Sequence, residues 1–270
     1  MSAFVFTLRD EPAQRLDLAP LVPQRLKGLR EADIAAIALN TTRDRVTVGD
    51  VFALRPGDSA QLRFEGGSAR FDRVGAEMAE GEIAVDGAVG AQAGRLMHGG
   101  RLTIGGDAGP WAGSGMRNGV VEIKGDAGDR LGGPLAGETA GMRGGVLIVR
   151  GNAGERAGDR LRRGTILIDG AAGSCLGSRM IAGTVIVGGA AGALPGYLMA
   201  RGSLVLGGGA AALSPTFADC GVHDLVANAL LAGFVRPFSR DLAAILTCPL
   251  RRLLGDMAVI GRGEIFYPAR

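Results

Sequence analysis

The chain of 270 residues combines 47 glycines with 47% hydrophobic and only 4% aromatic residues, and its formal net charge is +3. So high a hydrophobic content with so small a net charge excludes a disordered chain, and weak charge with few aromatic rings argues against a nucleic-acid partner. The glycines must therefore serve a regular fold with a substantial core.

Residues 1–72 are predicted to form an N-terminal cap with strands that lead into the rest of the fold. Apolar spacing predicts a strand, then a helix, then two further strands, at FVFTL (4–8), EADIAAIAL (31–39), RVTV (45–48) and AQLRFEG (60–66). These short elements precede the regular part of the sequence, and we expect them to cover its first end.

A repeat of 19 residues occupies 73–215. Each copy is marked by one large apolar residue, at Met78, Met97, Met116, Met142, Leu161, Met180 and Met199. A glycine follows three residues after each mark, and apolar residues follow five and seven residues after it, which is the alternation of a β-strand. The repeat predicts a mainly β fold of about seven stacked coils, in which equivalent residues form ladders and the apolar ladders face inward.

Further glycines recur nine, twelve and sixteen residues after the mark. They fit corners of a coil, because glycine adopts positive φ and permits close backbone approach. The interval between Met116 and Met142 is longer by seven residues, which predicts a loop projecting at about 132–141. Residues 180–200 carry no charge over a length that can span a bilayer, but they obey the repeat, so we expect a buried coil and no membrane segment.

Residues 216–270 are predicted to form a C-terminal helical cap with a final strand. Helical apolar spacing appears at 222–235 and 239–254, and GEIFYP at 263–268 has the pattern of a strand. Caps are expected at both ends, since an uncovered stack of strands exposes an edge that pairs with other chains.

The sequence indicates neither a catalytic group nor a metal site. It contains two histidines, His98 and His223, and three cysteines without metal-ligand spacing. We expect a surface position for His98, a buried thiol at Cys175, and hydrogen bonds within their own turns for the corner residues Asp107, Asp126 and Asn152. We predict no cofactor bound by the chain's own residues, and the cysteine usage and the lack of a leader pattern in the first residues favour a cytoplasmic protein.

Two ladders carry the functional hypotheses. Arginines at or beside the position after the mark, Arg117, Arg143, Arg162 and Arg163, are predicted to bind an anionic carrier or partner, because stacked like charges repel unless anions intervene. Neutralisation within the chain by Glu138 and Asp159 is the alternative. On the outward face of the strands, an apolar run predicts a protein interface formed by Ile148, Leu167, Ile186 and Val205.

The repeats resemble a known family. GETAGMRGGVLIVRGNAGERAGDRLRRGTILIDGAAG, followed by SRMIAGTVIVGG, is similar to the C subunit of formylmethanofuran dehydrogenase and to the matching component of the bacterial formyltransferase/hydrolase complex. A more distant similarity is to the C-terminal β-helix domain of glutamate synthase. The likeness is close over about 46–211, and the alanine- and arginine-rich composition favours the bacterial, methylotrophic version.

The resemblance implies a right-handed parallel β-helix, or solenoid, that serves as a non-catalytic scaffold. In such complexes a formyltransferase subunit passes the formyl group of formyl-tetrahydromethanopterin to a methanofuran-type carrier, and a metal-dependent, amidohydrolase-like subunit releases formate. The carrier bears a glutamate-rich tail, and carrier and metal are expected in partner subunits.

Three alternatives stay open at this point. The first is a different host complex, a tungsten or molybdenum formylmethanofuran dehydrogenase, and the second is a spacer of the kind found between the catalytic domains of glutamate synthase. The third, a free-standing β-helix acyltransferase, belongs to a different class. Its left-handed coils have a six-residue sub-period and a catalytic histidine, whereas the period here is 19 and neither histidine recurs.

Overall fold

The computed structural model describes residues 2–41 and 43–269. The N-terminal part holds short elements: β1 (Ala3–Leu8), β2 (Leu16–Asp17), α1 (Pro23–Leu26), α2 (Glu31–Ala35), β3 (Ala38–Thr41), β4 (Val46–Thr47), α3 (Val48–Val51), β5 (Phe52–Arg55), β6 (Asp58–Glu65) and β7 (Phe71–Asp72). The repeats supply β8 (Glu82–Val85), β9 (Arg101–Ile104), β10 (Val120–Ile123), β11 (Arg143–Val149), β12 (Arg163–Ile168), β13 (Thr184–Val187), β14 (Ala191–Ala193), β15 (Arg201–Leu206) and β16 (Ala210–Ala212). The C-terminal part contains β17 (Ala218–His223), α4 (Val226–Val235), α5 (Arg240–Ile245), β18 (Leu250–Gly255), the 3-10 helix η1 (Met257–Val259) and β19 (Arg262–Pro268).

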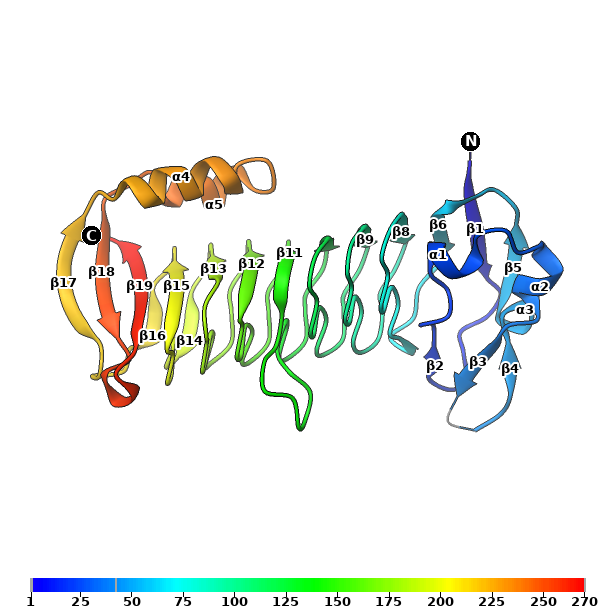
Figure 1. The fold of residues 1–270 in the computed structure, drawn as a ribbon, viewed down its shortest axis with the longest axis horizontal. Coiled ribbons are helices and arrows are strands. Elements are labelled where there is room, and N and C mark those ends of the chain that lie inside the picture. Colours follow the sequence, from blue (N-terminus) through cyan, green and yellow to red (C-terminus); the bar gives the residue numbers. More distant parts are fainter. Residues whose placement is uncertain (1, 42, 270) are drawn as a thin grey trace.

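The fold is mainly β and is dominated by one sheet of 13 strands, in the order β17-β18-β19-β15-β13-β12-β11-β10-β9-β8-β6-β1-β5. From β6 to β15 every neighbouring pair is parallel, and the strands stand side by side along the long axis (Figure 1). The sequence prediction of a strand in each repeat is therefore confirmed.

Successive repeats pair at equivalent positions. Leu102 of β9 is opposite Val121 of β10, which is opposite Leu147 of β11. A second ladder of single bridges joins the repeats at another corner, through Val89, Ala108, Ala127, Ala153, Ala172 and Ala191. The seven marks and the inward apolar residues of the strands are fully or almost fully buried. Each repeat thus extends one continuous core.

Glycine three residues after the mark permits this stacking. Gly164 has φ +99°, and a Cβ there would lie 2.8 Å from the carbonyl oxygen of Gly145 in the preceding repeat. A side chain would therefore meet rigid backbone as well as an unfavourable φ.

The structure corrects the predicted bounds in the two terminal parts. The helix expected over 31–39 ends at Ala35, and β3 begins at Ala38, where it pairs with β2 and β4. The helix expected over 239–254 ends at Ile245, because Pro249 disfavours helical geometry just before it, and β18 follows in antiparallel pairing with β19. The strands predicted at 4–8 and 263–268 are confirmed as β1 and β19.

The apolar outward ladder does not face solvent, which contradicts the prediction of a protein interface there. Ile148, Leu167, Ile186 and Val205 are at most 1% exposed. They form a second hydrophobic cluster with residues of α4, α5 and the strands that follow, which are Ala232, Val235, Leu242, Ala243, Leu246, Leu250 and Phe266. The chain's own helices lie over one side of the later strands (Figure 1) and cover the patch.

Arg150, directly after β11, joins the helical cover to the sheet. Its guanidinium donates to Glu122 at 2.6 Å, to Asp169 at 3.1 Å and to the carbonyl oxygen of Phe238 at 2.9 Å, and Ser239 donates to Asp169 at 2.9 Å. Partial burial lowers the pKa of Arg150, but the hydrogen bonds to the two carboxylates outweigh it and raise the pKa above its ordinary value. The link between α4 and α5 is thereby tied to the sheet.

The side chains of the corner residues make different hydrogen bonds from those predicted. Asp107 accepts a hydrogen bond from the Asp126 amide at 2.7 Å, Asp126 from the Asn152 amide at 2.6 Å, and Asn152 from the Ala171 amide at 2.9 Å. The bonds run from one repeat to the next rather than within one turn, so these side chains join the stack.

Replacing Gly164 by alanine is expected to lower the free energy of unfolding by about 3 kcal/mol or more, since strain at positive φ adds to a backbone clash. Gly137→Ala is the matched control: its φ is +85°, but a Cβ there meets nothing within 4 Å. It is expected to cost about 1 kcal/mol. Urea unfolding of both variants checks this, and equal losses would contradict the role of close stacking.

Candidate functional site: an exposed arginine row

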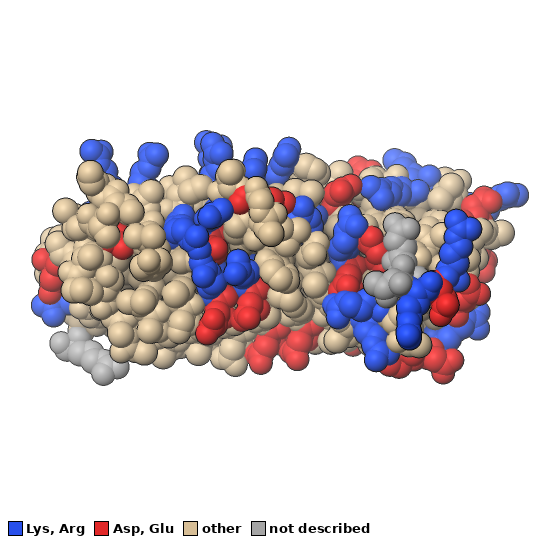
Figure 2. All heavy atoms as spheres, turned by 90° about the horizontal axis from the view of Figure 1, so that it is seen from below, with Lys and Arg blue, Asp and Glu red and all other residues tan. Residues whose placement is uncertain are grey.

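The predicted arginines stand in a row because their repeats stack in register. The amides of Arg117, Arg143 and Arg162 each donate to the carbonyl oxygen of the mark in the preceding repeat, at 2.8, 2.7 and 2.9 Å. Arg163, the first residue of β12, lies opposite Arg143. All four side chains are exposed, and basic side chains stand out along the upper edge of the view in Figure 2, over the half that holds the later repeats.

The carboxylates that were candidates to neutralise the row are paired with other arginines. Glu138 forms a salt bridge with Arg95 at 2.7 Å. Asp159 is 2% exposed and lies 3.5 Å from Arg179 and 3.7 Å from Arg156. Within 2–41 and 43–269, no side-chain hydrogen bond or salt bridge involves the arginines of the row, Arg117, Arg143, Arg162 and Arg163. Their guanidinium groups are therefore available to outside carboxylates.

The row continues beyond the residues that the sequence singled out as its site. Arg201 begins β15 and Arg262 begins β19, and the two lie opposite each other in register. Both are exposed. Arg143, Arg163, Arg201 and Arg262 all precede a glycine at the start of a strand. This Arg-Gly pair could have placed Arg262 in the row from the sequence, although that residue lies outside the regular repeat.

The inserted loop makes a hollow beside the first arginines. The hollow has a volume of about 250 Å³ and is lined by Leu96, Gly115, Arg117, Gly137, Glu138, Thr139, Ala140 and Arg143. Partial burial raises the pKa of Glu138, but hydrogen bonds from Arg95 and the Leu135 amide, with the nearby charge of Arg143, hold it below its ordinary value. The ionised Glu138 fixes the loop, and neither lining arginine forms a side-chain hydrogen bond or salt bridge among the described residues.

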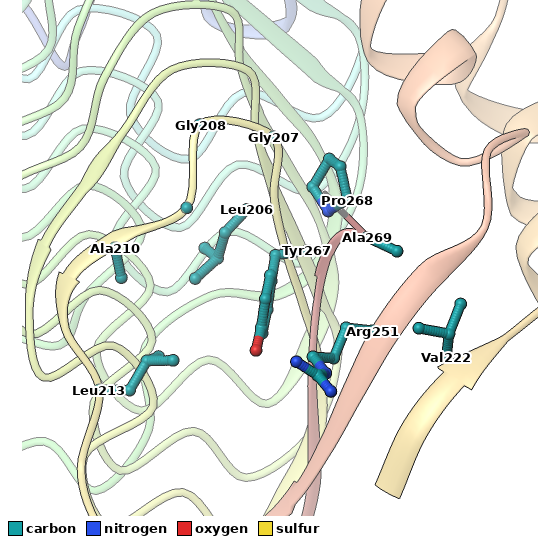
Figure 3. A pocket seen from close by; sticks show the side chains of 11 residues that line it. Leu206, Gly207, Gly208, Ala210, Leu213, Val222, Arg251, Tyr267, Pro268 and Ala269 are labelled. Carbon is teal, nitrogen blue, oxygen red and sulfur yellow. The ribbon is translucent and has the colours of Figure 1, made fainter. Parts of the chain in front are cut away.

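A second cavity of about 460 Å³ lies at the C-terminal end of the repeats (Figure 3). It is bounded by the last repeat and by β17, β18 and β19, with Leu206, Leu213 and Tyr267 around it. Arg251, on the same wall, forms a salt bridge with Asp219 at 3.3 Å. Its one charged lining residue is thus already paired, so this cavity is a weaker candidate for binding an anion.

The two histidines take different places in the described part of the chain. His98 is exposed, and His223 Nε2 lies 2.8 Å from the carbonyl oxygen of Cys220. Among the described residues, no group of three His, Cys, Asp or Glu side chains is placed to hold a metal ion. Cys175 is half-buried at φ +58°, rather than fully buried as predicted. No helix within residues 2–41 and 43–269 has the length and apolar character needed to cross a membrane.

These features define a class: a glycine-rich protein of stacked parallel strands that carries a row of exposed arginines along its repeats. No protein-family model matches the chain. It is, however, 53% identical over 262 residues to the C subunit of the formyltransferase/hydrolase complex Fhc of Methylorubrum extorquens, and the match covers 97% of this chain and 98% of that protein. The chain belongs to the family of that subunit.

A solved structure agrees with this assignment. The chain matches one in the crystal structure of the formyltransferase/hydrolase complex FhcABCD from Methylorubrum extorquens in complex with methylofuran. The TM-score is 0.95 at 45% identity, and the match covers 98% of this chain and 100% of that chain. The resemblance deduced from the repeats is thus confirmed.

Glu138→Gln is expected to loosen the inserted loop at neutral pH, because the amide loses charge-assisted bonds to Arg95 and to the Leu135 amide. Hydrogen exchange of the Leu135 amide should rise about fivefold, the equivalent of about 1 kcal/mol. Since the pKa of Glu138 is lowered in the folded protein, its stabilisation is complete above the ordinary value of 4.5 and is lost as pH falls through the folded pKa. The variant should lack this pH step.

Glu155→Gln provides the control, since Glu155 is exposed and its side chain makes no hydrogen bond among the described residues. In this variant the Leu135 amide of the inserted loop should exchange at the same rate as in the unmodified chain. Unchanged exchange at Leu135 in Glu138→Gln would show that the loop holds its shape without this carboxylate.

Proposed function

We propose that the chain is the C subunit, a non-catalytic scaffold, of a formyltransferase/hydrolase complex in one-carbon metabolism. Catalysis would reside in its partners, a formyltransferase subunit and an amidohydrolase-like subunit with metal. Together they convert formyl-tetrahydromethanopterin to formate through a methanofuran-type carrier. The 53% identity over nearly the whole of both chains supports this assignment, and it favours the hydrolytic host over the dehydrogenase and over a free-standing acyltransferase.

The architecture that we propose is a right-handed parallel β-helix over 73–215. Residues 1–72 would close one end as a cap with leading strands, and residues 216–270 would close the other as a helical cap with a final strand. Parallel pairing of equivalent residues in successive repeats supports this arrangement. We place the protein in the cytoplasm, in keeping with its three free cysteines.

The single observation behind the proposed site is the row of exposed arginines without carboxylate partners among the described residues. Four guanidinium groups on three successive repeats match a ligand that presents carboxylates at regular spacing. The glutamate-rich tail implied for the carrier has this chemistry, and so do acidic side chains of a neighbouring subunit. Binding would position the carrier or the partner along the stack, without a chemical step on this chain.

Reversing two charges tests the site. Arg143→Glu with Arg162→Glu is expected to weaken the binding of carrier or partner at least tenfold, since attraction becomes repulsion at the centre of the row. Co-purification of the assembled complex, its native mass, its carrier content and its turnover distinguish the two ligands. Loss of carrier with an intact mass indicates the tail, and loss of a subunit indicates a protein partner.

Lys27→Glu with Arg45→Glu changes the net charge equally, at exposed positions in the N-terminal part. That variant should assemble and turn over normally. If the row variant also kept its assembly, carrier content and turnover, the arginine row would have no part in the complex.

A further inference from the structure

The ladder of bridges at the corner of the repeats ends in an open strand edge. Its last strand, β16, pairs with β14 in a sheet of two strands, and Ala210 lies opposite Ala191. Over the part of the chain that the structure describes, no strand follows β16 on its other side. The main sheet, in contrast, continues past the last repeat, because β19 lies beside β15 with Arg262 opposite Arg201. The C-terminal part therefore supplies the next strand on one face of the stack and leaves the corner ladder without one.

Two main-chain amides at this edge lack the acceptor that their equivalents have in the preceding repeat. The Ala191 amide donates to the carbonyl oxygen of Gly209 at 2.9 Å and so joins its repeat to the following one. Ala210 stands at the same position one repeat later, and its amide has no acceptor within residues 2–41 and 43–269. The first free donor is thus the Ala210 amide.

The second free donor is the amide of Leu213. One repeat earlier, the Leu194 amide donates to the carbonyl oxygen of Ala212 at 2.8 Å. The Leu213 amide meets no such oxygen among the residues that the structure describes. Ala210 and Leu213 are three residues apart, which is about 10 Å along an extended chain. A ligand that accepts from both amides must itself be extended, since a small ion does not span that distance.

A neighbouring edge shows how this chain protects a strand that stays unpaired. β17, the end strand of the main sheet, has a bulge between Asp219 and Val222. The Asp219 carboxylate accepts from the Gly221 amide at 2.8 Å, and His223 Nε2 lies 2.8 Å from the carbonyl oxygen of Cys220. Bulges, charges and prolines at an edge prevent pairing with other chains. β16 consists of three alanines and has none of these features, so its edge is open to a further strand.

The cavity at the C-terminal end of the repeats lies directly beside this edge (Figure 3). Ala210 and Leu213 line it together with Leu206 and Tyr267, and its volume is about 460 Å³. Leu213 and Tyr267 are only partly buried, and both pack against the main core. The cavity therefore has an apolar wall and room for a large side chain from a strand laid against β16.

We propose that an extended segment of another subunit adds to β16 as the next strand of the corner ladder. Its carbonyl oxygens accept from the Ala210 and Leu213 amides, and one large apolar side chain enters the cavity beside Leu206 and Tyr267. Proteins bind peptides at open sheet edges in this way, where main-chain hydrogen bonds supply affinity and a pocket supplies specificity. The segment comes from a partner in the formyltransferase/hydrolase complex, so the strand addition rests on the proposed function.

A second copy of this chain fits the edge less well. Two β16 strands placed edge to edge offer each other only alanine side chains, which leave the cavity empty. The nearby end strand β17 is blocked by its bulge. A segment of a different chain that carries a bulky apolar residue satisfies both the free amides and the cavity.

Hydrogen exchange in the purified complex tests the two hydrogen bonds. The Ala210 and Leu213 amides should be protected, and Ala210→Lys, which puts a charge into the cavity, should raise exchange at Leu213 at least tenfold. Ala218→Lys, at an exposed position of the blocked strand β17, is the matched control and should leave that exchange unchanged. The Leu194 amide, bonded within the stack, should stay protected in both variants and so reports on folding. Exchange of Ala210 and Leu213 at the rate of unprotected amides in the unmodified complex would overturn the proposal.

Photo-crosslinking identifies the segment without relying on a disruptive variant. Benzoylphenylalanine in place of Ala212, which is exposed on β16, should crosslink to a single segment of another subunit in the purified complex. The same replacement at Ala193, the equivalent position of β14, is the control and should yield at least fivefold less product. A crosslink to a second copy of this chain, equal yields from the two positions, or no crosslink from Ala212 would each contradict the strand addition.

The subunit content of the same preparation separates this inference from the proposed function. A chain that purifies without a formyltransferase and an amidohydrolase-like subunit contradicts the proposed function, and the strand addition fails with it. A complex that holds those subunits while Ala210 and Leu213 exchange freely overturns the strand addition alone.

Discussion

The structure depends on the fixed register between successive repeats. Main-chain hydrogen bonds join equivalent positions, and they form only because glycine at positive φ lets one repeat approach the next, as at Gly164 over Gly145. Once the register is set, each position of the repeat becomes a ladder of like residues. The buried methionines, the aspartate and asparagine bonds between corners, and the arginine row all follow from this one constraint.

The strands and ladders that arise from the repeat could be predicted from the sequence. The marks and the alternation after them placed β8 to β13 and β15, since each repeat contacts mainly its neighbours and local pattern decides the contacts. The row of Arg117, Arg143 and Arg162 was predictable for the same reason. The terminal parts were less so, because β3 and β18 form through pairing with strands that no period connects to them.

The prediction for Ile148 and its ladder failed because the cover comes from α4 and α5, far along the chain. A signal was nevertheless present. The outward ladder changes from Thr103 and Glu122 to Ile148 at the point where the second hydrophobic cluster begins. The sequence also did not indicate the salt-bridge partners of Glu138 and Asp159, because Arg95 and Arg179 come close to them only in the stacked repeats.

The two ends of β11 show how differently this chain uses arginine. Arg150 follows the strand, bonds to two carboxylates and holds the helical cover to the sheet. Arg143 begins the strand and forms no side-chain hydrogen bond or salt bridge among the described residues, although its charge acts on the nearby Glu138. Neighbouring charges about 5 Å apart in water repel by the order of 1 kcal/mol. An anion lying along the row removes that repulsion, so its affinity should fall as salt screens the charges. The stacked repeats therefore hold exposed arginines close together, and the proposed carboxylate ligand reduces the repulsion between them.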